Sequence, residues 1–172
     1  MNIAAQPPVQ ADQTIYLKDY QKPAFLVESI HLDIQVYDDH TIVDSTLVMQ
    51  RQAAGELVLL GRDLELQSIQ MNGQLLNVDQ YQLDSEQLMI TDAPEQVIVK
   101  TKVIIHPESN TQLEGLYKAG DLFVTQNEPE GFRKITFYPD RPDVLAEFTT
   151  RVEADKKYPV LLANGNLLET GE

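Results

Sequence analysis

Along much of this chain apolar and polar residues alternate with a period of two, which is the pattern of β-strands that bury one face. The even positions from 30 to 36 are Ile, Leu, Ile and Val, and polar residues fill the odd positions between them. The odd positions from 43 to 49 are Val, Ser, Leu and Met. Asp-Asp-His at 38–40 separates the two segments, so we predict an antiparallel hairpin.

Short apolar or alternating segments continue beyond this hairpin. Asn72-Gly73 is the strongest short-range hairpin signal among the turns that separate them. No segment has the periodicity of an amphipathic helix over three turns. The sequence therefore predicts a mainly β fold, an antiparallel sandwich or barrel-like pair of sheets. We expect its further strands at 57–60, 64–71, 75–78, 81–83, 88–90 and 97–105.

The character of the chain changes after position 107. Residues 108–143 are rich in aromatic side chains, glycine and proline, and such segments on a β scaffold are common places for binding surfaces. Proline is favoured at the first position of a helix, so we expect one helical turn after Arg141-Pro142. Residues 148–152 and 158–162 predict two more strands.

Composition and charge exclude several classes of function. The chain has 27 acidic and 13 basic residues and a formal net charge of -14, which disfavours a nucleic-acid partner because phosphates would be repelled. It contains no apolar run of the roughly 18–20 residues needed to cross a bilayer. The first eight residues lack a basic and an apolar region typical of a secretory signal. With no cysteine in the chain, we expect a soluble, cytoplasmic protein that engages neither membrane nor nucleic acid.

The chain lacks a catalytic constellation of its own. Its three histidines, His31, His40 and His106, are far apart in sequence, and a His-Glu-x-x-His zinc motif does not occur. A Gly-x-Ser-x-Gly elbow and a phosphate-binding glycine loop are also missing. We therefore predict no catalytic residue and no metal ligand within these 172 residues.

Five sequence blocks in the last third of the chain carry a specific resemblance. They resemble, in order and spacing, the M1 family of zinc metallopeptidases, and within it the bacterial aminopeptidase N group. Similarity before position 26 is looser and confined to 16–20 and 23–25. The blocks are NTQLEGLY at 110–117, TQNEPEGFR at 125–133, YPDRPDV at 138–144, FTT at 148–150 and YPVLLANGN at 158–166.

The resemblance implies an enzyme that removes amino-terminal residues from peptides with a single zinc ion, a metallo-exopeptidase of the membrane alanyl aminopeptidase type. It implies that residues 25–172 are the saddle-like N-terminal β domain of such an enzyme, after an extended lead-in over 1–24. In that family the domain packs on a catalytic domain that carries a Gly-x-Met-Glu-Asn motif and the zinc ligands. Neither motif occurs here, so we expect an inactive, metal-free fragment that ends before the last strands of its domain.

Two residues are expected to bind substrate by this resemblance. Glu128 would bind the free α-ammonium group of a peptide, and Gln126 would line the pocket for its first side chain. A fixed carboxylate can distinguish a charged terminus from an internal neutral amide by a charge-assisted hydrogen bond. We expect Glu130 to pair with Arg133 instead of substrate, and residues 140–143 to form a network that holds the pocket wall.

Two alternatives remain open from the sequence. Glutamates in loops with proline and glycine are usually solvated surface charges, and Glu128 fits that description as well. The whole chain could also be a non-enzymatic peptide-binding or scaffold domain on the same β fold, because fold does not dictate function. A reading frame that continues to a His-Glu-x-x-His motif would favour the enzyme over the stand-alone module.

Overall fold

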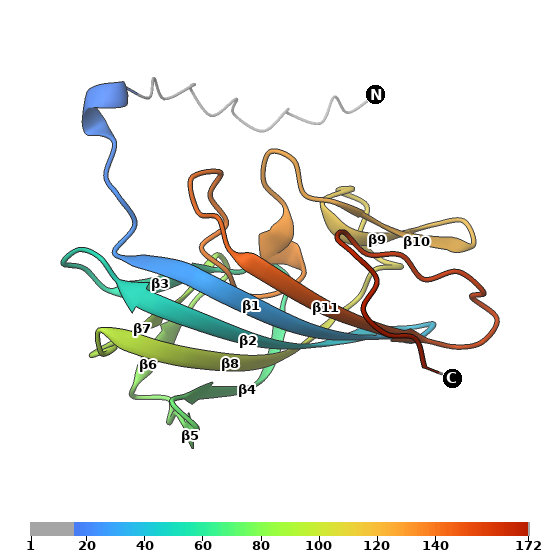
Figure 1. The fold of residues 1–172 in the computed structure, drawn as a ribbon, viewed down its shortest axis with the longest axis horizontal. Coiled ribbons are helices and arrows are strands. Elements are labelled where there is room, and N and C mark those ends of the chain that lie inside the picture. The colour runs from blue at the N-terminus through green and yellow to red at the C-terminus, as the bar shows by residue number, and fades with distance from the viewer. Residues whose placement is uncertain (1–15, 172) are drawn as a thin grey trace, which may run out of the picture.

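The structure is a computed structural model that describes residues 16–171, and it is built almost entirely from β-strands (Figure 1). Two short 3-10 helices, η1 (Leu17–Asp19) and η2 (Phe132–Lys134), complete this part of the chain. None of its helices is both long and apolar enough to span a membrane. The strands are β1 (Phe25–Val36), β2 (Thr41–Arg51), β3 (Leu57–Leu60), β4 (Glu65–Met71), β5 (Gln74–Leu75), β6 (Tyr81–Leu83), β7 (Gln87–Ile90), β8 (Gln96–Ile105), β9 (Gly115–Ala119), β10 (Leu122–Gln126) and β11 (Glu147–Ala154).

The strands form one large sheet, one small sheet and a separate hairpin. The six-stranded sheet has the order β11-β1-β2-β8-β4-β5, the three-stranded sheet the order β3-β7-β6, and β9 pairs with β10. In Figure 1 the small sheet lies behind the large one, and β9–β10 lies above the far end of β1 and β2. The predicted mainly β fold and the predicted hairpin at 38–40 are therefore confirmed.

A bulge in β1 explains why its buried residues change phase. Phe25 and Val27 are buried at odd positions, whereas Ile30 and Leu32 are buried at even positions. The pairing of β1 with β2 shifts by one residue between Val27 and Ser29. An extra residue in one strand of a pair turns the following side chains to the other face. All four apolar side chains therefore reach the same core.

A second bulge does the same in β4. The pairing of β4 with β8 shifts between Leu66 and Ser68, so Leu66 packs against the core from an even position and Ile69 from an odd one. The strand ends at Asn72 (φ 50°) and Gly73 (φ 82°), the positive φ pair of a tight hairpin turn. The predicted Asn72-Gly73 hairpin is confirmed by the pairing of β4 with β5.

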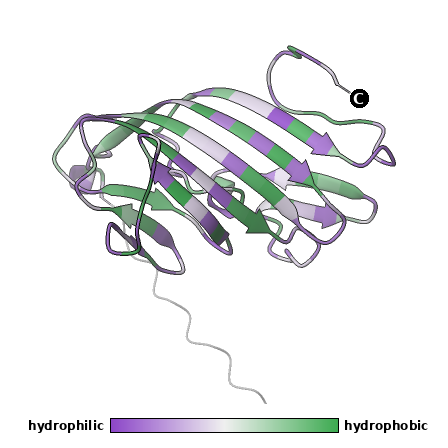
Figure 2. Ribbon diagram, turned by 90° about the horizontal axis from the view of Figure 1, so that it is seen from below, coloured by the Kyte–Doolittle hydropathy of each residue, from purple (hydrophilic) through white to green (hydrophobic). Residues whose placement is uncertain are grey.

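One apolar core lies between the large sheet, the small sheet and the segment that follows η2. Green and purple bands alternate along the strands in Figure 2, as expected for sheets with one buried face. The largest side chains that are fully buried are Phe137, Ile30, Leu47, Met49, Leu57, Leu59, Leu88, Ile90, Val43, Val97, Val99 and Val103.

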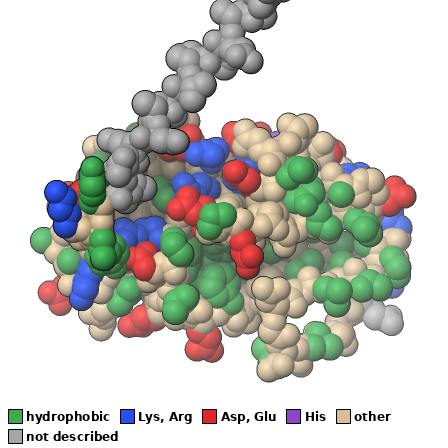
Figure 3. All heavy atoms as spheres, turned by 90° about the horizontal axis from the view of Figure 1, so that it is seen from above, with side chains coloured by type: hydrophobic (Ala, Val, Ile, Leu, Met, Phe, Trp, Pro, Cys, Tyr) green, Lys and Arg blue, Asp and Glu red, His purple; other side chains and the backbone are tan. Residues whose placement is uncertain are grey.

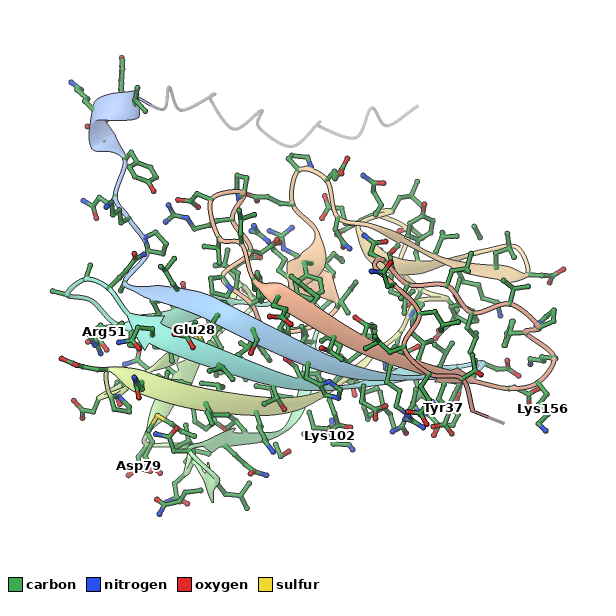
Figure 4. The ribbon with its side chains drawn as sticks, viewed as in Figure 1. Glu28, Tyr37, Arg51, Asp79, Lys102 and Lys156 are labelled. Atoms are coloured by element: carbon green, nitrogen blue, oxygen red, sulfur yellow. The ribbon has the colours of Figure 1, made fainter. Side chains whose placement is uncertain are left out.

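The outward face of the large sheet carries charged side chains, among them Glu28 and Lys102 (Figure 4). Lys102 on β8 pairs with Asp44 on β2 at 2.9 Å (Nζ to Oδ2). At the end of β2 the guanidinium of Arg51 lies 4.3 Å from the centre of the Phe25 ring and donates to the carbonyl oxygen of Ala93. These contacts fix the strand ends at the edge of the core.

Four expectations from the sequence are wrong in detail. The strand expected at 75–78 is limited to β5, which ends at Leu75. The large sheet is mixed and not purely antiparallel, because β11 runs parallel to β1. These two strands are more than a hundred residues apart, so no tight turn joins them and imposes the antiparallel direction. Residues 158–162 form no strand, since Pro159 removes a backbone donor and the ring of Tyr158 packs on Phe123 at 5.5 Å. Residues 141–144 form a turn instead of a helical turn.

The expected lead-in is described only from position 16. Its described part is exposed and contains η1, while residues 1–15 lie outside the described part of the chain. The lead-in is tied to the rest of the molecule near its end, where Gln52 donates from Nε2 to the carbonyl oxygen of Pro23 at 2.7 Å. The chain then enters β1 at Phe25.

A substitution at Gly61 tests the packing of the core. A Cβ atom at this position would lie 2.3 Å from a ring carbon of Phe137, which is 1% exposed. We expect Gly61→Ala to lower the free energy of unfolding by about 1–3 kcal/mol through overpacking, measured by urea denaturation of the chain. Gly171→Ala is the matched control, because no atom lies within 4 Å of its added Cβ. Equal midpoints for the two variants would contradict this packing.

Candidate functional site

The candidate site is the loop that leaves the hairpin of β9 and β10. The two strands pair from Leu122 opposite Ala119 to Gln126 opposite Gly115, so Gln126 is the last paired residue. Residues 127–130, here called the Glu128 loop, connect it to Gly131, which precedes η2. The hairpin thus delivers both predicted substrate-binding residues, Gln126 and Glu128, to one short loop.

The side chains of Gln126 and Glu128 are both exposed, and they meet only through the backbone. Gln126 donates from Nε2 to the carbonyl oxygen of Glu128 at 3.1 Å. The peptide bond between Glu128 and Pro129 is cis. Within residues 16–171 the Glu128 carboxylate takes part in no ion pair and no hydrogen bond. Its charge is therefore free to meet a cation from outside this part of the chain.

Gly131 brings the two ends of the Glu128 loop together. Its φ of 154° is rarely adopted by residues with a side chain, and a Cβ atom here would lie 2.7 Å from the carbonyl oxygen of Gln126. The same Cβ would lie 3.2 Å from the backbone nitrogen of Gly115. Glycine is required because the backbone of the returning chain touches the end of the hairpin.

An acidic residue beyond η2 holds the returning end of the loop. Asp140 accepts hydrogen bonds at Oδ2 from the backbone nitrogens of Gly131 (3.1 Å) and Arg133 (3.2 Å) and from Arg133 Nε (2.8 Å). Arg133 also donates from Nη2 to Glu130 Oε2 at 2.5 Å. The expected pair of Glu130 and Arg133 is therefore present, and Asp140 belongs to the expected network.

The rest of the 140–143 network ties the lead-in to the same region. Arg141 forms two hydrogen bonds to the carboxylate of Asp143, at 2.8 and 2.7 Å, and donates to the carbonyl oxygen of Gln21. Tyr20 donates from its hydroxyl to Asp143 Oδ2 at 2.8 Å. The hydrogen bonds from Arg141 hold the pKa of Asp143 below its usual value, and the hydrogen bond to Asp143 raises the pKa of Tyr20.

Aromatic rings support the loop from below. The ring of Phe132 packs edge-on against Tyr138 at 5.0 Å and against Phe148 at 5.7 Å. Tyr138 is 4% exposed, and its hydroxyl has no hydrogen-bond partner among the residues that the structure describes. Burial, and then the nearby charge of Asp140, raise the pKa of Tyr138 to about 12.

A cavity of about 580 Å³ lies apart from the Glu128 loop, and neither Gln126 nor Glu128 lines it. The buried ammonium of Lys134 donates there to Asp63 Oδ2 (2.6 Å) and Gln112 Oε1 (2.7 Å), which satisfies the charge with protein partners. No pattern in the sequence indicates that this lysine is buried, because a lysine side chain is usually exposed. The Glu128 loop, together with Gln126 at its start, therefore lies outside this cavity.

Two of the three histidines, His40 and His106, lie on either side of Asp39. His40 contacts Asp39, and His106 contacts Glu65 at 3.0 Å and the carbonyl oxygen of Asp39. These two oxygen partners, the carbonyl first, raise the pKa of His106. No group of three or more histidine, aspartate or glutamate side chains that could hold a metal ion occurs within residues 16–171.

Apolar side chains occur across the face seen from above, and most of its charged side chains lie among them on the left half (Figure 3). Large apolar side chains are exposed in the C-terminal part of the chain, including Leu145 (83%), Phe148 (50%) and Leu162 (87%). Exposed apolar groups in this number are typical of a surface that contacts other protein.

Comparison with known proteins gives concordant results. Residues 18–172 match the family described as Peptidase M1 N-terminal domain. Aminopeptidase N of Caulobacter vibrioides is 42% identical to the chain over 161 residues, which cover 92% of this chain and 19% of the relative. The chain therefore spans about a fifth of the length of such relatives.

Solved structures share the fold. Aminopeptidase A of Legionella pneumophila, solved in complex with aspartic acid, superposes with a TM-score of 0.83 and 32% identity over 89% of this chain and 19% of that chain. An M1 zinc metallopeptidase of Deinococcus radiodurans superposes with a TM-score of 0.65 and 22% identity over 76% of this chain and 33% of its own. The second likeness shows a common fold alone.

The buried phenol of Tyr138 predicts a loss of stability at alkaline pH. Because the folded pKa is raised from 10.0 to about 12, the hydroxyl ionises first in the unfolded chain, and stability falls as pH rises from 10 to 12. The free energy of unfolding of the wild type falls between pH 9 and 11, and we expect Tyr138→Phe to reduce this fall by about 1 kcal/mol, measured by urea denaturation. Tyr117→Phe is the control, and parallel alkaline slopes for wild type and Tyr138→Phe would contradict the buried phenol.

Proposed function

Because this chain belongs to the M1 peptidase family, whose N-terminal domain it matches over residues 18–172, we propose that it is the substrate-binding domain of a zinc-dependent aminopeptidase. The full-length protein hydrolyses peptides at their amino-terminal residue, and the chain alone hydrolyses nothing. The single observation that carries this proposal is the carboxylate of Glu128, which has no partner within residues 16–171, on a loop whose two ends are fixed.

Glu128 binds the α-ammonium group of the peptide in this proposal. The exposed carboxylate has no competing cation within residues 16–171, although Arg133 lies close in sequence, because Arg133 is held by Glu130 and Asp140. A carboxylate that meets an ammonium group in a cleft closed by another domain gains far more than at an open surface. The Legionella relative was solved with aspartic acid, an amino acid that carries a free α-ammonium group.

The same contact fixes the scissile bond. A peptide held at its terminal nitrogen presents its first carbonyl group at a set distance from Glu128, and an internal segment of a chain lacks the charge to bind there. Orientation of this kind lowers the barrier of the chemical step by positioning. Gln126, two residues earlier at the end of β10, lines the pocket of the first side chain.

The zinc ion that the family implies does not fit the residues of this chain. Zinc sites in proteins take three or four converging nitrogen, oxygen or sulfur ligands. The sequence has no cysteine, and residues 16–171 hold no cluster of three or more candidate ligands. We therefore place zinc in the remainder of the full-length protein and assign no step of the reaction to it here.

The proposed partner of this domain is the catalytic domain of the same protein. The exposed apolar side chains of the C-terminal part, among them Leu145 and Leu162, favour a protein surface as the neighbour. The formal net charge of -14 disfavours nucleic acid. We propose the cytoplasm as the location, where a chain without cysteine loses no stabilising disulfide.

Replacement of Glu128 tests the proposal in the full-length protein. Glu128→Gln keeps the shape of the side chain and removes its charge, so kcat/KM for an aminoacyl-arylamide should fall by about 10²-fold or more. Asp121→Asn is the matched control, since Asp121 is an exposed acidic residue at the opposite end of the same hairpin. Unchanged kcat/KM in Glu128→Gln would reject the α-ammonium role.

A further inference from the structure

The Glu128 loop is clamped at both ends by different means. At its start, Gln126 is paired with Gly115 across the β9–β10 hairpin. At its end, Asp140 Oδ2 accepts hydrogen bonds from the backbone nitrogens of Gly131 and Arg133. Only four residues lie between the two fixed ends, so the loop has little freedom to move its carboxylate.

Asp140 is itself anchored to the core. The residue two positions earlier, Tyr138, forms a two-way backbone bridge with Leu60, with hydrogen bonds of 2.8 and 3.0 Å. Asp140 donates from its backbone nitrogen to the carbonyl oxygen of Tyr138 at 2.8 Å. Leu60 is the last residue of β3. Asp140 therefore fixes the position of the Glu128 loop relative to the small sheet.

The charge pair in the clamp is shielded from solvent. The side chain of Asp140 is 10% exposed and that of Arg133 is 14% exposed, and they meet at 2.8 Å. Arg133 Nη2 donates in addition to the carbonyl oxygen of Asp140 at 3.0 Å. A partly desolvated pair with several hydrogen bonds has one favoured geometry, which distinguishes it from an exposed and mobile ion pair.

The two ends of the loop are in direct contact. Gly131 packs so closely on Gln126 that a single added carbon would lie 2.7 Å from the carbonyl oxygen of Gln126. Gln126 in turn donates to the carbonyl oxygen of Glu128. A displacement of Gly131 would therefore displace Gln126, and through it Glu128, by direct contact.

From this geometry we infer that Asp140 is a positioning residue for peptide binding: it holds Gly131 and Arg133 so that the Glu128 carboxylate stands where the α-ammonium group arrives. Asp140 does not touch the peptide and acts through Glu128. The inference rests on the proposed function, because Glu128 is the group that it positions. It assigns to Asp140 a part in the selection of peptide termini beyond its part in folding.

A double-mutant cycle in the full-length protein separates positioning from folding. Asp140→Asn keeps the shape of the side chain but removes the charge that holds Arg133 and Gly131. In the wild-type background it should lower kcat/KM for an aminoacyl-arylamide about tenfold or more, since a misplaced anchor no longer orients the substrate. In the Glu128→Gln background it should change kcat/KM less than about twofold, because the positioned charge is already gone.

Asp33→Asn is the matched control for this cycle. Asp33 also pairs with an arginine, Arg151 at 2.9 Å, but the two lie on β1 and β11 of the large sheet and hold no residue of the Glu128 loop. We expect this variant to keep the kcat/KM of the wild type. If Asp140→Asn does not fold, Arg133→Lys replaces it in the cycle, because lysine keeps the charge but loses the fork that binds Asp140 and Glu130.

The results of the cycle separate a failure of the positioning role of Asp140 from a failure of the proposed function. If Asp140→Asn lowers kcat/KM equally in both backgrounds, or in neither, the positioning role is overturned. A large loss of kcat/KM in Glu128→Gln would still support the proposed function. If Glu128→Gln alone leaves kcat/KM unchanged, the proposed function fails, and the positioning role fails with it.

Discussion

Burial of one continuous apolar face by β1, β2 and β8 is the constraint on which the rest of the molecule depends. These three strands are the longest in the described chain and pair over nearly their full lengths. Their inward side chains need a cover, which the three-stranded sheet and the segment around Phe137 provide. The two bulges keep the inward side chains on this face where the strands twist. The loops connect the strands of this layered core.

The candidate site lies on a loop, but its position is fixed by groups in or next to the core. Tyr138 bridges to β3, Asp140 follows it, and Arg133 connects Asp140 to Glu130. Charged groups that are partly desolvated and multiply hydrogen-bonded hold one geometry. The backbone that carries Glu128 is therefore held, while its carboxylate stays exposed and without a partner within residues 16–171. A carboxylate in this state is suited to recognise a cation that arrives from outside.

Much of the fold follows from local patterns in the sequence, and much of the site does not. Alternation predicted β1, β2 and β8, because period two is a property of each strand alone. It missed β9 and β10, where residues 115–126 alternate poorly and only Gly115 and Leu116 are buried. It also missed that β11 is parallel to β1, since direction depends on partners far apart in the chain. The Asp140 clamp is likewise a tertiary arrangement with no local signature.

The proposed roles of Gln126 and Glu128 came from a resemblance to relatives. No physical rule applied to the sequence separates Glu128 from the other exposed acidic residues, and some of these, such as Glu28 and Asp121, likewise form no ion pair within residues 16–171. What sets Glu128 apart is its place on a loop held by Arg133 and Asp140, which only their contacts reveal. The expected pair of Glu130 with Arg133 is present, with Glu130 in the bend before η2 and Arg133 within η2.

The parallel strand at the edge of the large sheet bears on the order of folding. Arg151 on β11 meets Asp33 on β1 across 118 positions of sequence, whereas β1 and β2 meet across a tight turn. Closing so long a loop before any local contact forms is entropically unfavourable. The β1–β2 hairpin and β8 are therefore the natural nucleus, and β11 is added to a sheet that already exists. As an edge strand that pairs with β1 alone, β11 can detach without breaking the pairing of β1 with β2 or of β2 with β8.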